Sequence, residues 1–195
     1  RRRIREGPYI MSLKFPGPTD RLYILGRSGC GKTTAAIWHL SGRDPRAQPI
    51  VLVNTKGDST LNEIAAIPGV ITVTTDDNIG DGGIYHVRPD TMTKEGQISL
   101  NNFLRRLLER GNCVVLIDEG YMIEIDDALN GLLTQGRDKN ISMIVLTQRP
   151  TWISKFVESE ANFVQLFNLS RLDDRKNVTG LVPVDKNYRL AKYCS

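Results

Sequence analysis

The stretch "GRSGCGKTT" at residues 26–34 combines three glycines with a lysine and two threonines, a combination suited to binding phosphate. Gly26, four further residues, Gly31, Lys32 and Thr33 match the P-loop pattern of nucleotide-binding proteins. Glycines let the backbone curl so that successive amides point at phosphate oxygens, beside a helix N-terminus. An apolar strand pattern before the loop and a helical pattern after it supply the context that the motif requires. The stretch therefore predicts a site for a nucleoside triphosphate.

The two positions that end this motif have definite expected roles. We expect Lys32 to reach the β- and γ-phosphates of ATP, and the Thr33 hydroxyl to bind the accompanying Mg²⁺. The residues expected to bind the nucleotide are Gly26, Arg27, Ser28, Gly29, Cys30, Gly31, Lys32, Thr33 and Thr34.

Two carboxylates end the apolar run "CVVLIDEG" at residues 113–120. Consecutive apolar residues predict a strand buried on both faces, and ligands bind at the carboxyl edge of such a sheet. Asp118 can then hold the hydration shell of Mg²⁺ opposite Thr33. Glu119 is placed to polarise the attacking water as a general base.

A second buried strand, in "ISMIVLTQRP" at residues 141–150, ends in polar residues. We expect this strand to lie beside the strand that carries the two acids. Gln148 could contact the γ-phosphate or the attacking water and so link hydrolysis to movement. It could equally cap the loop that Pro150 ends, and the sequence leaves both roles open.

The elements that must position these residues alternate along the chain, which predicts an α/β fold with a mostly parallel central sheet covered on both faces. The fold class expected is the three-layer P-loop NTPase of the RecA/ASCE-like type. Strands are expected at 21–25, 49–54, 70–75, 84–89 and 163–170 and within 113–120 and 141–150, and helices at 33–40, 60–67 and 99–111. We expect residues 1–20 to form an N-terminal extension or edge element, and residues 21–195 a single ATPase domain.

Composition narrows the class of protein further. The net charge of +4 and the pI near 9.0 permit a nucleic-acid partner without requiring one. Three cysteines form no paired or metal-binding pattern, and no apolar run approaches the length of a membrane span. We therefore expect an intracellular protein in a reducing compartment that does not itself span a membrane.

The phosphate loop, "VLIDE" and "GRDKNISMIVLTQRP" together resemble the FtsK/HerA superfamily of DNA-translocating ATPases. "VLVNTKGD" at residues 51–58 adds to the resemblance, although Asn54 stands where an acid is common in that superfamily. The resemblance implies a homo-oligomeric ring, a hexamer or a pentamer, in which an arginine of the neighbouring subunit completes each ATP site. Arg137 is the first choice for that arginine, with Arg149 and Arg171 in reserve.

The short chain resembles, within that superfamily, the genome-packaging ATPases of icosahedral viruses with an internal membrane. This implies sequence-independent contacts to double-stranded DNA, action in the host cytoplasm or at the packaging vertex of the virion, and capsid vertex or portal proteins as partners. Residues considered for DNA contact are Arg88, Lys94, Lys56 and Lys139. Trp38, Trp152 and Phe156 are expected in the core or at a subunit interface.

Three alternatives share the phosphate loop. A conjugation- or secretion-type FtsK/HerA motor would share the catalytic residues but usually carries an inserted helical domain. A small-molecule kinase would need an arginine-rich lid over its acceptor. A nucleotide-dependent switch would bind ATP without appreciable turnover, which the acid at position 119 argues against.

Overall fold

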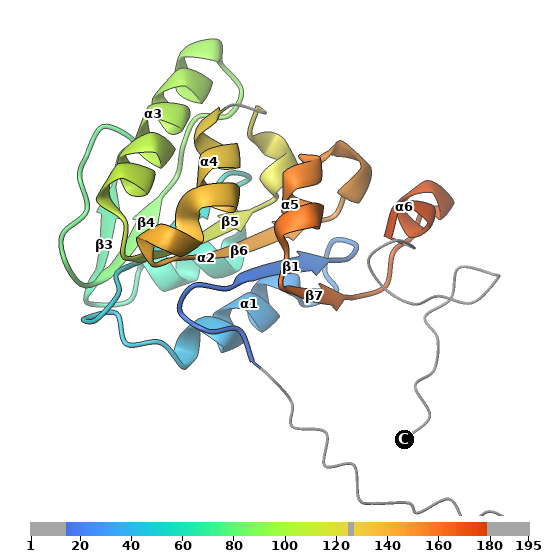
Figure 1. Ribbon diagram of the computed structural model, residues 1–195, viewed down its shortest axis with the longest axis horizontal. Helices are drawn as coiled ribbons and strands as arrows, with labels where there is room; N and C mark the ends of the chain where they lie inside the picture. Colours follow the sequence, from blue (N-terminus) through green and yellow to red (C-terminus); the bar gives the residue numbers. More distant parts are fainter. Residues whose placement is uncertain (1–14, 125–126, 179–195) are drawn as a thin grey trace, which may run out of the picture.

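A computed structural model describes residues 15–124 and 127–178, so the N-terminal run of arginines and Cys194 lie outside the described residues (Figure 1). Seven strands of the described part form one sheet in which every pairing is parallel. The strands are β1 (Arg21–Leu25), β2 (Ile50–Asn54), β3 (Val70–Val73), β4 (Ile84–Val87), β5 (Cys113–Asp118), β6 (Ile141–Thr147) and β7 (Phe163–Leu166). The expected α/β class with a parallel central sheet is confirmed.

Helices cover both faces of this sheet (Figure 1). They are α1 (Lys32–Ser41), α2 (Ser59–Ala65), α3 (Lys94–Arg110), α4 (Asp127–Gln135), α5 (Lys155–Glu160) and α6 (Leu172–Asn177). Side chains of α1 and α2 pack with one apolar cluster, and side chains of α3, α4 and α5 pack with another. The two clusters take alternate residues of the central strands, because successive side chains of a strand point to opposite faces. None of the described helices is long and apolar enough to cross a membrane.

The strand order β3-β4-β2-β5-β6-β1-β7 brings distant parts of the sequence together. Strand β6 lies between β1, which leads into the phosphate loop, and β5, which ends in the two acids. All three strands run the same way, so their carboxyl ends lie at one edge of the sheet. The expectation that the Gln148 strand neighbours the acid-bearing strand is therefore confirmed.

Helix α3 begins at Lys94, five residues before the helix expected at 99–111. The Thr93 side chain caps it by accepting a hydrogen bond from the Gly96 amide at 3.1 Å. Gly96 suggested a loop, but a Cβ there would lie 2.1 Å from the Asp90 carbonyl oxygen, so the glycine permits a close approach of two backbones. Lys94 is thus the first residue of a helix and not part of a free loop.

Helix α4 was not expected from the sequence at all. Gly131 interrupts its helical pattern, and a Cβ on Gly131 would lie 2.7 Å from a methyl carbon of Leu108 on α3. The glycine therefore lets α4 approach α3 closely, which compensates for its poor helix propensity.

Candidate nucleotide and catalytic site

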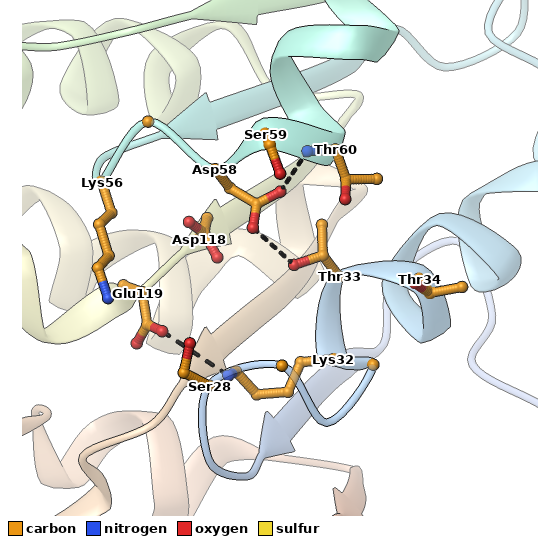
Figure 2. Close-up of a pocket in the computed structure, with 13 residues that line it drawn as sticks. Ser28, Lys32, Thr33, Thr34, Lys56, Asp58, Ser59, Thr60, Asp118 and Glu119 are labelled. Carbon is orange, nitrogen blue, oxygen red and sulfur yellow. Dashed lines mark hydrogen bonds and ion pairs between the residues drawn. The ribbon is translucent and has the colours of Figure 1, made fainter.

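A pocket of about 450 Å³ opens at the carboxyl edge of the sheet (Figure 2). The phosphate loop, the turn between β2 and α2, and the end of β5 form its walls. Its lining residues are Ser28, Gly29, Gly31, Lys32, Thr33, Thr34, Lys56, Gly57, Asp58, Ser59, Thr60, Asp118 and Glu119. Six of the nine residues expected to bind the nucleotide are among them; Gly26, Arg27 and Cys30 are not.

The glycines of the loop serve two different purposes. Gly29 (φ 72°) and Gly31 (φ 94°) adopt the left-handed conformation, which residues other than glycine rarely adopt. Gly26 instead permits a close approach, because a Cβ there would lie 2.6 Å from both Cys30 Sγ and Phe167 Cβ. The curled backbone expected from the sequence is therefore present, and it ends at the N-terminus of α1.

Lys32 and Glu119 face each other across this pocket. Lys32 Nζ lies 3.7 Å from Glu119 Oε1, and each side chain is only 6% exposed. The ammonium group also donates a hydrogen bond to the Arg27 carbonyl oxygen at 3.3 Å. Figure 2 shows the lysine reaching across the loop toward the carboxylate. The buried lysine thus has a negative partner within its own chain.

Two features of the backbone fix Glu119. It has φ 50° and ψ 63°, a left-handed conformation that is uncommon for glutamate. Its other carboxylate oxygen, Oε2, accepts a hydrogen bond of 2.9 Å from the backbone N–H of Gln148, at the end of β6. The Gln148 side chain donates to the Tyr121 hydroxyl at 3.0 Å. The residue expected to act as general base is therefore bonded directly to the residue expected to report on the γ-phosphate.

Asp118 is almost completely buried beside this pair. Burial, and then the neighbouring carboxylates of Glu119 and Asp58, raise the pKa of Asp118 to about 7; Lys32 and Lys56 oppose the rise. A carboxyl group held with so much negative charge nearby is stabilised in its ionised form by a cation.

Asp58 is a pocket residue that the sequence analysis missed. Its Oδ2 accepts a hydrogen bond of 3.4 Å from the Thr33 hydroxyl, and its Oδ1 accepts from two amides at the start of α2 (Figure 2). Buried Asn54 holds the turn in place, since its Oδ1 accepts from the Asp58 amide at 2.7 Å. Asn54 stands where an acid is common in the superfamily, and the carboxylate of Asp58, four residues later, enters the pocket instead. Its signal in the sequence was an aspartate directly before a helical pattern.

The donor set fits Mg²⁺ bound together with phosphate. Among the described residues there is no group of three or more acids, histidines or cysteines that could hold a metal ion by itself. Mg²⁺ usually takes one or two carboxylates and completes its shell with water and substrate phosphates. The Thr33 hydroxyl with Asp118 and Asp58 supplies that kind of partial shell beside the phosphate loop.

The other candidate residues divide between the two edges of the sheet. Arg137 and Lys139 precede β6 and lie at the edge opposite the pocket, so neither contributes to the site of its own chain. Arg149 and Arg171 follow β6 and β7 and line a separate cleft beside the pocket. Lys56, considered for DNA contact, lines the nucleotide pocket itself.

Arg88 and the three aromatic residues are exposed. The Arg88 guanidinium packs over Gly57, within 2.9 Å of where a Cβ would stand. Trp38, Trp152 and Phe156 are 60%, 62% and 45% exposed, so they are not core residues, and the alternative of a subunit interface stays a prediction. Their helical spacing suggested a packed face, but each lies on the solvent side of its segment.

With β6 inserted between the phosphate-loop strand and the acid-bearing strand, the fold and the site together are those of a P-loop NTPase. No family model matches the sequence. The chain is 40% identical over 178 residues to the DNA packaging ATPase P9 of Enterobacteria phage PRD1, which covers 90% of this chain and 75% of P9. The chain therefore belongs to the family of P9-like viral DNA packaging ATPases, and the resemblance to packaging ATPases noted in the sequence is confirmed.

Solved structures of low sequence identity share the fold. The genome packaging NTPase B204 of Sulfolobus turreted icosahedral virus 2, in complex with AMP, is 18% identical with a TM-score of 0.64, over 85% of this chain and 83% of that one. The cytoplasmic domain of EssC is 16% identical with a TM-score of 0.61, over 91% of this chain and 36% of that one.

Proposed function

We propose that this chain hydrolyses ATP and uses the free energy to move double-stranded DNA into a virus particle. The observation that carries the proposal is the position of Glu119, whose carboxylate lies in the phosphate-loop pocket 3.7 Å from Lys32 Nζ and is held by the Gln148 amide. Membership of the family of P9, a DNA packaging ATPase, supports DNA as the substrate that is moved.

The proposed mechanism begins with an exchange of partners. When ATP occupies the loop, Lys32 turns from Glu119 to the β- and γ-phosphates, where its charge offsets the negative charge of the transition state. Glu119, still held by the Gln148 amide, orients a water molecule for in-line attack on the γ-phosphorus and accepts its proton. Mg²⁺ held by Thr33 and Asp118 would draw charge from the phosphate oxygens. The P–O bond to ADP breaks as the new P–O bond to water forms.

Gln148 is the proposed reporter of the γ-phosphate. Its backbone amide donates to Glu119, and its side chain donates to the Tyr121 hydroxyl. A side chain that exchanges this hydroxyl for a phosphate oxygen would move the loop that follows β6, which supplies two discrete positions for one segment.

We further propose a homo-oligomeric ring in which Arg137 of one subunit reaches the nucleotide of its neighbour. The support is the position of Arg137, which is exposed at the sheet edge opposite its own pocket and could serve another subunit. A guanidinium can fork onto two phosphate oxygens and is always charged. In this proposal the ring acts in the host cytoplasm, where it binds capsid vertex or portal proteins.

The test is the steady-state rate of ATP hydrolysis with and without double-stranded DNA, over a series of protein concentrations. We expect the rate to rise with DNA and more steeply than linearly with protein, and Glu119→Gln to bind ATP with turnover reduced by a factor of about 10² or more. A rate of ATP hydrolysis per protein molecule that depends neither on DNA nor on the protein concentration would contradict the proposed motor. Phosphate transfer to a small acceptor would favour a kinase instead.

A further inference from the structure

We infer that a second cleft, beside the nucleotide pocket, binds the phosphodiester backbone of the DNA. The cleft has a volume of about 350 Å³, and three arginines line it, Arg27, Arg149 and Arg171. Ser28 lines both this cleft and the nucleotide pocket, so the two are adjacent. The inference rests on the proposed function, because it states where that function holds its DNA.

The topology of the sheet brings the three arginines together. Arg27 follows β1, Arg149 follows β6 and Arg171 follows β7, and these three strands are neighbours in the sheet. Because the strands are parallel, the segments after them emerge at the same edge, although the arginines are up to 144 positions apart in the chain.

The charge of the cleft suits an anion. The ion pairs among the described residues involve Lys32, Arg46 and Arg110, so no described carboxylate lies within 4 Å of the three cleft guanidinium groups. Of the residues that the structure describes, Asp174 is the single acid lining the cleft, and it is buried and accepts a hydrogen bond of 3.3 Å from the Thr151 hydroxyl. Among these described lining residues, three arginines against one aspartate leave an excess of positive charge. Planar guanidinium groups fit phosphate oxygens in pairs.

A continuous series of contacts joins this cleft to the proposed base. The Arg149 guanidinium lies over the Trp152 ring, 5.1 Å from its centre, and Trp152 meets Tyr121 edge-on at 5.9 Å. Tyr121 accepts the hydrogen bond from the Gln148 side chain, and the Gln148 amide donates to Glu119. A phosphate that draws Arg149 from the indole face would therefore disturb residues bonded to Glu119.

The DNA backbone is the anion that these observations favour. Arginine contacts to phosphate do not depend on the base sequence, and a motor that moves a whole genome must grip every sequence alike. The nucleotide's own phosphates have a separate place at the glycines and Lys32 of the phosphate loop. The four DNA-contact residues considered from the sequence do not line this cleft.

The experiment measures binding of a short fluorescein-labelled DNA duplex by anisotropy over a series of salt concentrations, with a non-hydrolysable ATP analogue present. We expect Arg171→Gln and Arg149→Gln each to lower the slope of log affinity against log salt by about 1. The matched control is Arg105→Gln, which removes the same charge from an exposed position on α3 and should leave the slope unchanged. In a Trp38→Phe background Trp152 is the only tryptophan of the chain, and duplex binding should change its fluorescence.

Three results would overturn the inference. In the first, the salt slope is the same in both cleft variants and in the control. In the second, the cleft variants lose affinity for the ATP analogue but keep their affinity for DNA. In the third, the cleft variants lose only their self-association. The second result would mean that the cleft binds the nucleotide, and the third that it binds a second copy of the chain. A wild-type protein that binds no duplex and whose turnover ignores DNA would refute the proposed function as well.

Discussion

The ion pair between Lys32 and Glu119 allows a test in the protein without nucleotide. At 3.7 Å, two unit charges attract by about 4 kcal/mol at an effective dielectric constant of about 20, and by about 1 kcal/mol in water. Each side chain is only 6% exposed, so the coupling should lie between these limits and above that of surface pairs. Removing Lys32 alone leaves a buried carboxylate without its cation, which is strongly destabilising.

We therefore expect Lys32→Met to lower the free energy of unfolding by more than the same change made in a Glu119→Gln background. The assay is urea unfolding at pH 7.5 with EDTA, on the wild type, both single variants and the double variant. The difference between the two effects of Lys32→Met is the coupling energy, expected between about 1 and 4 kcal/mol.

The exposed pair of Arg46 and Asp44, at 3.0 Å, is the matched control, for which the same cycle should give no measurable coupling. Strictly additive effects of Lys32→Met and Glu119→Gln would refute the reasoning, because they would show that the two side chains are not coupled.

Three further changes test the pocket. Asp58→Asn should keep the cap of α2 and the stability of the protein but weaken the binding of Mg²⁺ with an ATP analogue. Asp58→Ala should in addition lower the free energy of unfolding by about 1 kcal/mol. If calorimetry gives the same analogue affinity for wild type and Asp58→Asn, Asp58 does not bind the metal. The pKa of Asp118 is raised from 3.8 to about 7 in the folded protein, so its contribution to stability is present below pH 3.8 and is lost as the pH rises through 7. Asp118→Asn should thus be more stable than wild type at pH 8 in EDTA, by up to about 4 kcal/mol in urea unfolding, and an equal or lower stability would contradict this. Gly26→Ala should lower the affinity for the ATP analogue at least about tenfold (1.4 kcal/mol), because a Cβ at position 26 has no room. Gly42→Ala should leave that affinity unchanged, because nothing lies within 4 Å of a Cβ there. An unchanged affinity in Gly26→Ala would mean that the loop can shift.

The residues that the sequence predicted are those whose function depends on local spacing. The phosphate loop needs only a strand, a turn and a helix in succession, so the place of Lys32 and Thr33 in the pocket could be predicted from residues 21–40. The proximity of Glu119 and Gln148 could be predicted because each follows a buried strand, and parallel strands bring such ends to one edge.

The residues that the sequence did not predict depend on the tertiary structure. Asp58 had the local signal of a helix cap, but it enters the pocket because β2, whose Asn54 holds the turn, pairs with the strand that carries Asp118. The cleft of Arg27, Arg149 and Arg171 exists only because β7 adds to the sheet beside β1. Conversely, Arg137 is near Gln148 in sequence but lies at the other end of β6.

The backbone at Glu119 has a consequence for when the site becomes organised. Among the described residues other than glycine, Asn112, Asn140 and Glu119 have positive φ, and asparagine tolerates that conformation far better than glutamate does. Folding thus holds Glu119, the proposed general base, in an unfavourable backbone conformation, with one carboxylate oxygen already bonded to the residue that follows β6. The free energy that orients it is supplied once, when the chain folds, and not again at every catalytic cycle.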